Sequence, residues 1–336
     1  MKLFRTLVLC ACGLTLVVIL MGAYTRLSHA GLGCPDWPGC YGYLIGVPES
    51  AEEIDQANQA FPERAVETGK AWKEMIHRYL AEGLGLLIVL LAILAIVNRK
   101  KANQPFWLPL ILVALVIFQG ILGMWTVTLL LKPVVVMGHL LGGLCILSLL
   151  WWLALRTKNS TDLNSTNGPT KSTSWLVTGL VLLVIQISLG GWTSANYAAL
   201  ACPDFPTCQG EWWPETDFEE GFVFWRGLGQ NYEFGVLDNP ARTAIHLSHR
   251  LFAIVVGLFW LLLLLRIITS KHNSNNLRQI AGVSLVLLVV QIALGISNIV
   301  LHLPISVAVM HNGGAALLLL SVVTLIYYAR REIESD

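Results

Sequence analysis

Long apolar runs alternate with polar stretches of very different lengths along the chain. A run of about 20 apolar residues can cross a bilayer as a helix, and eight such runs occur. We predict membrane-spanning helices at residues 7–25, 75–97, 107–130, 134–155, 175–195, 243–268, 278–300 and 304–329. Two long polar loops occupy residues 26–74 and 196–242. Residues 156–174, rich in Ser, Thr, Asn and Gly, are typical of a flexible cytoplasmic linker.

Composition agrees with this pattern. Of the 336 residues, 55% are hydrophobic and only 13% are charged, whereas soluble domains carry about 25% charged residues. The formal net charge is +1, so the chain lacks the basic excess that marks nucleic-acid-binding proteins. These values predict an all-α polytopic membrane protein that does not bind nucleic acid.

The distribution of basic residues predicts an orientation. If the N-terminus is cytoplasmic, 13 of the 22 Lys and Arg residues fall on the cytoplasmic side, as the positive-inside rule requires. Lys2 and Arg5 before the first apolar run also resemble a secretory signal. That run continues to about Ala23, however, which favours a retained first span. We expect both termini to be cytoplasmic and both long loops to lie outside.

The chain contains an internal duplication. Residues 22–40 match residues 190–208 at an offset of 168, and both segments contain Cys-Pro-Asp-aromatic-Pro-x-Cys. His77 matches His249, and His139 matches His311, at an offset of 172. The repeat predicts two tandem four-helix halves, 1–155 and 175–336. Because each half has an even number of spans, a pseudo-two-fold axis along the membrane normal should relate them.

Four histidines stand near the outer ends of the even-numbered spans. His77 and His139 are 62 residues apart, and so are His249 and His311. A lone histidine there is best explained as a hydrogen-bonded interhelical residue, but matched pairs favour a shared ligand. Zinc prefers three or four ligands, and copper sites commonly add Cys or Met. Two imidazoles facing each other across an apolar gap therefore favour bis-histidine haem iron in each half.

The two halves differ one helical turn before the first histidine of each pair. Glu74 precedes His77 by three residues, and His246 precedes His249 by the same interval. Residues at this spacing share a helix face, and a buried carboxylate can accept a proton or stabilise positive charge. We predict that the first half is catalytic and that the second holds a resident cofactor. The alternative is that Glu74 only caps its helix in the wet interface.

Three arginines are candidate contacts for haem propionates. Arg78 and Arg250 directly follow His77 and His249, so they point about 100° away from the ligand face. They either reach propionates at the rim of a macrocycle or anchor the interface by snorkelling. Arg26, which Ser194 replaces in the second half, is a weaker candidate in the first site.

Each long loop carries one cysteine pair, Cys34–Cys40 and Cys202–Cys208. Disulfides persist in extracytoplasmic compartments, and the proline-containing spacing closes a tight loop. One interpretation is a structural staple in each loop. The other is a redox-active pair that passes electrons toward the haem.

These features together resemble the haem A synthase family over the whole chain. The resemblance implies that His77 and His139 hold the substrate haem O, that His249 and His311 ligate a haem b cofactor, and that Glu74 is an active-site acid. It also implies oxidation of the C8 methyl group of haem O to a formyl group, by successive hydroxylations and loss of water. A bacterial-type inner membrane is the expected location. Haem O synthase, cytochrome oxidase assembly factors and membrane lipid are the expected partners.

Two other functional classes fit part of the pattern. A quinol-linked dihaem b electron-transfer cytochrome also uses bis-histidine sites, but it does not need Glu74 in one half only. A transporter built from parallel repeats is less favoured, because such transporters contain helices broken near mid-membrane and these spans show few breaks.

Overall fold

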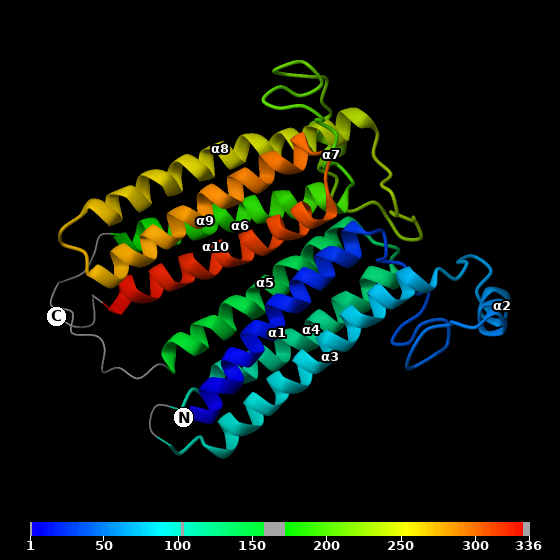
Figure 1. The fold of residues 1–336 in the computed structure, drawn as a ribbon, viewed down its shortest axis with the longest axis horizontal. Helices are drawn as coiled ribbons and strands as arrows, with labels where there is room; N and C mark the ends of the chain where they lie inside the picture. Colours follow the sequence, from blue (N-terminus) through cyan, green and yellow to red (C-terminus); the bar gives the residue numbers. More distant parts are fainter. Residues whose placement is uncertain (1, 102–103, 158–171, 332–336) are drawn as a thin grey trace.

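The computed structural model describes residues 2–101, 104–157 and 172–331 and is all-helical in these segments (Figure 1). Outside helices, the β-structure of these residues consists of the isolated bridges Cys40–Tyr43 and Cys208–Glu211. The helices are α1 Lys2–Leu27, α2 Ala51–Ala60, α3 Thr68–Val97, α4 Trp107–Thr128, α5 Pro133–Arg156, α6 Ser172–Ala195, α7 Phe218–Gly221, α8 Asn239–Thr269, α9 Asn275–Val300 and α10 Ile305–Arg331.

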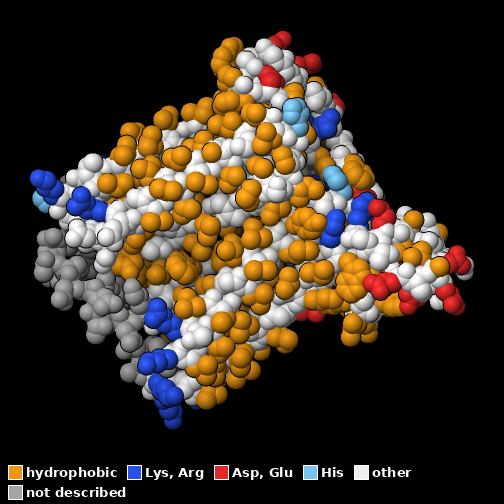
Figure 2. Space-filling view, viewed as in Figure 1, with side chains coloured by type: hydrophobic (Ala, Val, Ile, Leu, Met, Phe, Trp, Pro, Cys, Tyr) orange, Lys and Arg blue, Asp and Glu red, His pale blue; other side chains and the backbone are white. Residues whose placement is uncertain are grey.

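Eight of these helices are long and apolar enough to cross a membrane, which confirms the predicted polytopic membrane fold. They are α1, α3, α4, α5, α6, α8, α9 and α10. The short helices α2 and α7 lie in the two long polar loops. Lipid-facing sides of the spans remain apolar, so large hydrophobic side chains are widely exposed on the molecular surface (Figure 2).

Several helix starts differ from the sequence prediction. Helix α3 begins at Thr68 rather than at 75, and α8 begins at Asn239 rather than at 243. Asp238 caps α8 by accepting a hydrogen bond from the Ala241 amide, so the helix starts inside the polar loop. Apolar patterning marks where lipid contact begins, whereas backbone hydrogen bonding extends the helix beyond that point.

The helices pack in two groups of four. In the first group α1 contacts α3 and α5, and α4 also contacts both of these helices. In the second group α6 and α9 each contact both α8 and α10. Helices α1 and α5 contact α10, and α5 contacts α6, which joins the two groups (Figure 1). The two-fold relation between the groups and the domain boundaries at 155 and 175 stay predictions from the sequence repeat.

Most of the predicted linker 156–174 lies outside the described residues. At its edges, Arg156 is the last residue of α5, and residues 172–174 belong to the first turn of α6. The linker itself stays a prediction from composition.

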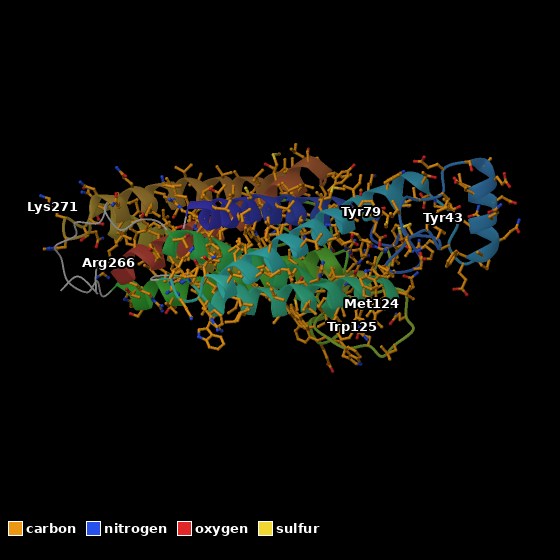
Figure 3. All side chains as sticks on the ribbon, turned by 90° about the horizontal axis from the view of Figure 1, so that it is seen from below. Tyr43, Tyr79, Met124, Trp125, Arg266 and Lys271 are labelled. Atoms are coloured by element: carbon orange, nitrogen blue, oxygen red, sulfur yellow. A yellow bond between two sulfur atoms is a disulfide. The ribbon has the colours of Figure 1, made fainter. Side chains whose placement is uncertain are left out.

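Charged side chains lie mainly at the two ends of the helix bundle. The charged side chains in view at the end where α1 begins and α10 ends are Lys and Arg, whereas Asp and Glu gather at the opposite end, together with further Lys and Arg (Figure 2). Arg266 and Lys271 lie at the first of these ends, far from Tyr43 and Tyr79 at the other (Figure 3). An apolar belt separates the two ends, as expected for a protein that crosses a bilayer.

Candidate functional site

The four predicted histidine ligands project from four different spans. His77 lies on α3 and His139 on α5, and their ring centroids are 6.4 Å apart with an interplanar angle of 83°. Metal–imidazole bonds are about 2 Å long, so one metal atom between two such rings requires a centroid separation of this size. His249 lies on α8 and His311 on α10, at the corresponding positions of the second helix group. The structure thus brings the first pair together and places the second pair on the corresponding helices.

A glycine on a neighbouring helix faces each of these imidazoles. A Cβ atom added at Gly22 would lie 2.9 Å from Cε1 of His77, and one at Gly190 would lie 3.0 Å from Cε1 of His249. Any larger residue would therefore force the ring to move. The four pairs are Gly22–His77, Gly123–His139, Gly190–His249 and Gly295–His311.

This arrangement fits a haem better than a bare metal ion. Among the described residues, no three His, Cys, Asp or Glu side chains gather closely enough to hold an ion on their own. The Nδ1 atoms of His77, His139 and His311 are buried without a hydrogen-bond partner. A haem needs only two axial protein ligands and tolerates apolar walls, so the donor set and its glycine neighbours suit that group.

Glutamine amides contact both histidines of the second pair. The Gln186 side chain lies 3.0 Å from Nδ1 of His249 and also donates to the His249 carbonyl at 3.1 Å. The Gln291 amide nitrogen lies 3.4 Å from Nε2 of His311. Contacts of this kind restrict the orientation of the two imidazole rings. Sequence reasoning missed Gln186. The signal was available, because at the repeat offset of 168 this polar residue corresponds to an apolar residue in the first half.

The first pair lacks these amide contacts. Val18 occupies the position on α1 that corresponds to Gln186 on α6. Gln119 is the counterpart of Gln291, yet its amide nitrogen is buried without a partner. In the described structure no side-chain hydrogen bond therefore holds the imidazole of His77 or of His139.

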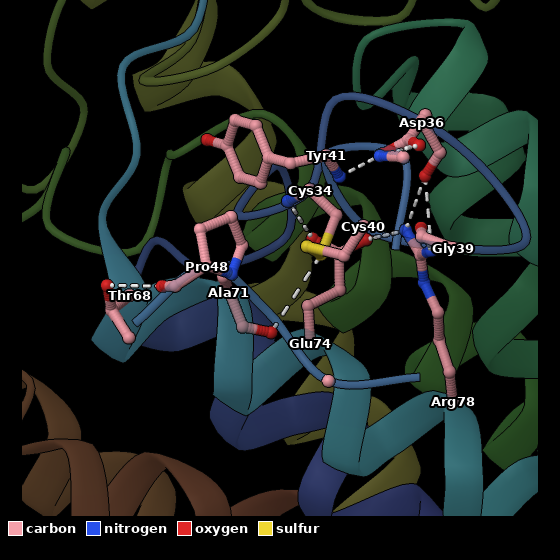
Figure 4. Close-up of a disulfide and its surroundings, with 12 residues drawn as sticks. Cys34, Asp36, Gly39, Cys40, Tyr41, Pro48, Thr68, Ala71, Glu74 and Arg78 are labelled. Atoms are coloured by element: carbon pink, nitrogen blue, oxygen red, sulfur yellow. Dashed lines mark hydrogen bonds and ion pairs between the residues drawn. A yellow bond between two sulfur atoms is a disulfide. The ribbon is translucent and has the colours of Figure 1, made fainter. Parts of the chain in front are cut away.

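Glu74 is buried on α3, with 5% of its surface exposed, and both carboxylate oxygens are engaged (Figure 4). One oxygen accepts a hydrogen bond from the Cys34 amide at 3.0 Å, and the other pairs with Arg78 at 2.5 Å. Because α3 begins at Thr68, the alternative in which Glu74 caps the helix is wrong. The carboxylate instead ties the first disulfide loop to the helix that carries His77.

His246 takes the corresponding position on α8 and makes a different contact. It is also buried, and its Nδ1 lies 2.9 Å from the Ala198 carbonyl. An imidazole in this place offers no fixed negative charge. The asymmetry expected from the sequence is therefore present in three dimensions, one helical turn from each candidate ligand.

Arg78 and Arg250 bind the two disulfide loops. Arg78 donates to the carbonyls of Asp36, Pro38 and Gly39, the last at 2.5 Å. Arg250 donates to the corresponding carbonyls in the second loop, including that of Thr207 at 2.6 Å. Sequence reasoning missed these partners because backbone carbonyls leave no signal in side-chain identity. Contact with haem propionates stays a prediction for both residues.

Arg26 crosses between the two helix groups. Its guanidinium donates to the Ser194 carbonyl at 2.7 Å and lies 4.0 Å from the centroid of the Tyr197 ring. The residue that the sequence assigns to the first site thus also holds the end of α6. Its proposed propionate contact stays a prediction.

Both predicted cysteine pairs form disulfides in the long loops. Cys34–Cys40 and Cys202–Cys208 have Cα–Cα distances of 4.8 and 4.5 Å, and all four residues are buried. The same aspartate contact supports both loops, since Asp36 accepts from the Tyr41 amide and Asp204 from the Gln209 amide, each five residues on. In the second loop, the hydrogen bond from Thr207 also lowers the pKa of Asp204.

Sequence comparison agrees with the arrangement of these residues. The profile of the COX15-CtaA family, described as a cytochrome oxidase assembly protein, matches residues 5–323. The chain belongs to this family. The chain is 49% identical over 314 residues to a heme A synthase of Shewanella oneidensis. This alignment covers 94% of the chain and 93% of the relative.

More distant members of the COX15-CtaA family match at nearly full length. The heme A synthase of Caulobacter vibrioides is 25% identical over 94% of this chain and 92% of its own. That of Shouchella clausii is 26% identical over 85% of this chain and 83% of its own. The similarity therefore extends across both long loops and all eight spans, so the whole chain has the organisation of the family.

Proposed function

We propose that this protein is a haem A synthase, which oxidises the C8 methyl group of haem O to a formyl group. Two successive hydroxylations, each a two-electron oxidation of the methyl carbon driven by an external oxidant, replace two C–H bonds by C–O bonds, and the resulting geminal diol loses water. The observation that carries this proposal is the 49% identity to a heme A synthase along nearly the whole chain. The paired histidines give that activity a physical basis in this protein.

The substrate haem O binds in the N-terminal half between His77 and His139. The 6.4 Å separation of their ring centroids supports this placement, and so does the close approach of Gly22 to His77. Neither imidazole has a glutamine partner, which suits a site that must accept a substrate and release a product. Apolar walls from the surrounding spans exclude water from the reacting methyl group.

The resident cofactor is haem b, ligated by His249 and His311 in the C-terminal half. When bound there it supplies one-electron transfer. Gln186 and Gln291 orient the two imidazoles and keep them in place. This support suits a permanent group that is not exchanged during turnover.

Glu74 acts as the charged group beside the substrate. Its carboxylate lies one helical turn from His77, and Arg78 and the Cys34 amide hold its two oxygens in place. A fixed negative charge stabilises positive charge that develops as C–H bonds of the methyl group break. Arg78 keeps that charge oriented and binds the disulfide loop over it.

We further propose that the protein lies in a bacterial-type inner membrane with both termini in the cytoplasm. The basic end of the molecule then faces the cytoplasm and the acidic loops face outward (Figure 2). Both histidine pairs lie toward the outer face. Haem O synthase and cytochrome oxidase assembly factors are the partners that this function requires for supply and delivery.

Haem extraction from the purified full-length protein tests the proposal. Expressed in cells that make haem O, the protein should carry haem b together with haem O or haem A, separated by chromatography. Haem b alone at two per chain would instead identify an electron-transfer cytochrome. A protein without haem would refute both functions and favour the transporter.

A further inference from the structure

Each disulfide loop exposes large apolar side chains at corresponding positions. Immediately after the bridge that closes each hairpin, Leu44 and Ile45 are 75% and 85% exposed, and Trp212 and Trp213 are 76% and 62% exposed. The repeat offset of 168 superposes the two dipeptides. Trp37 and Phe205, inside the two hairpins, are also exposed and correspond at the same offset. We call these two segments, 34–45 and 202–213, the disulfide hairpins.

The two sequences differ at these positions while the apolar character is kept. A Leu-Ile dipeptide in one hairpin corresponds to Trp-Trp in the other. Exposed apolar clusters of this kind mark interaction surfaces rather than random surface composition. A specific protein partner would select defined shapes, whereas a lipid surface accepts any large apolar side chain.

Contacts with the spanning helices fix the depth of the hairpins. Arg78 and Arg250 lie about three turns inside α3 and α8, roughly 15 Å from the helix starts. Both guanidinium groups hold hairpin carbonyls. Helical side chains tilt toward the N-terminus, so the hairpins sit near the level where the apolar part of each span begins.

A second contact brings the first dipeptide to the same level. The Gly46 amide, directly after Ile45, donates to the Tyr79 hydroxyl at 2.8 Å. Tyr79 lies on α3 within the predicted apolar span 75–97, and Tyr43 lies near it in Figure 3. Exposed side chains at 44 and 45 are therefore beside the outer boundary of the membrane.

The second hairpin projects sideways rather than along the helix axes. In Figure 1 the green-yellow segment between α6 and α7 extends laterally past α8 at the outer end of the bundle. A lateral projection at this depth runs parallel to the bilayer surface. Tryptophan is the residue that membrane proteins concentrate at that boundary.

We propose that the two disulfide hairpins are membrane-interface anchors, which insert Leu44–Ile45 and Trp212–Trp213 among the headgroups of the outer leaflet. The bilayer surface thereby holds each hairpin at a fixed height. Because Arg78 and Arg250 hold the hairpins and directly follow His77 and His249, this contact positions each hairpin relative to the helix that carries a candidate ligand. Lipid, and not a second protein, contacts the exposed side chains of the two dipeptides.

Photocrosslinking in the full-length protein tests this proposal. The photoreactive residue p-benzoylphenylalanine replaces Ile45, Trp212 or Trp213 singly, in vesicles of phosphatidylethanolamine and phosphatidylglycerol. Matched controls carry it at Leu86, on the lipid-facing side of α3, and at Glu52, on the exposed surface of α2. Adducts are identified by mass spectrometry after irradiation.

We expect phospholipid adducts at positions 45, 212 and 213 to be as abundant as at Leu86. We expect none at Glu52. Absence of phospholipid adducts at 45, 212 and 213, as at Glu52, would overturn the proposal. Crosslinked dimers of this chain would also overturn it and would assign the surface to a second copy. Correct folding of each variant is checked by monodisperse size-exclusion elution, which does not depend on the proposed enzymatic function.

Discussion

The N-terminal and C-terminal halves place the same histidine–glycine pairs on corresponding helices but surround them with different side chains. Glu74, and a His77 without a side-chain amide partner, belong to the first half, whereas His246 and the Gln186–His249 contact belong to the second. A duplicated framework can thus serve two purposes once a few neighbouring residues diverge. The carboxylate suits chemistry on a bound molecule, and the amides suit retention of one.

The largest effect expected from this contrast is at Glu74. In the Glu74→Gln variant haem A formation should fall by roughly 10²–10³, the usual cost of removing one electrostatic partner from an active site. Haem O or a hydroxylated intermediate should accumulate, and haem b should remain. The ratio of extracted haems, separated by chromatography, is the measurement.

Two matched variants separate charge from architecture. His246→Gln alters the corresponding position and should leave haem A formation near normal. Arg78→Gln breaks the same ion pair and the hairpin contacts but keeps the carboxylate. Arg78→Gln should therefore lower haem A formation less than Glu74→Gln does, and near-normal haem A formation in Glu74→Gln would refute the catalytic role of the carboxylate.

The disulfides provide a second comparison between the halves. If the Cys34–Cys40 bond is a staple, the double Ala variant should lose about 2–4 kcal/mol of unfolding free energy and retain turnover. The Cys202→Ala, Cys208→Ala variant should behave alike, because both bonds close hairpins held by an arginine. Thermal unfolding and haem A yield are measured together. Unchanged stability with abolished turnover in the first variant alone would establish a redox role there.

A smaller effect is expected from exchanging Gln186 and Val18. Substituting a residue that hydrogen-bonds a metal ligand typically lowers the affinity for the metal group by about 10–100-fold. Gln186→Val should therefore speed haem b loss to a haem-scavenging protein by about this factor, and Val18→Gln should slow release of haem A from the first site. Absorption spectra follow both processes. Equal rates of haem b loss from wild type and Gln186→Val would show that the Gln186 amide does not help to retain haem b.

Apolar patterning predicted the eight spans because lipid contact imposes long continuous apolar runs. It placed the start of α3 too late, since Thr68–Glu74 is helical but polar. The repeat predicted the histidine pairs and the contrast between Glu74 and His246. It could not predict the Arg78 contacts, whose partners are backbone carbonyls brought near by the folded hairpin. The repeat alignment shows that Gln186 corresponds to Val18, but only the packing of α6 against α8 shows that Gln186 contacts His249.

The central claim is that the first histidine pair holds the substrate and the second holds haem b. Quantifying each extracted haem per chain in His139→Ala and in His311→Ala tests it most directly. We predict that His139→Ala retains one haem b per chain and loses haem O and haem A. We predict that His311→Ala loses haem b or changes its absorption spectrum. Loss of haem b from His139→Ala, with an unchanged haem b spectrum in His311→Ala, would contradict the account.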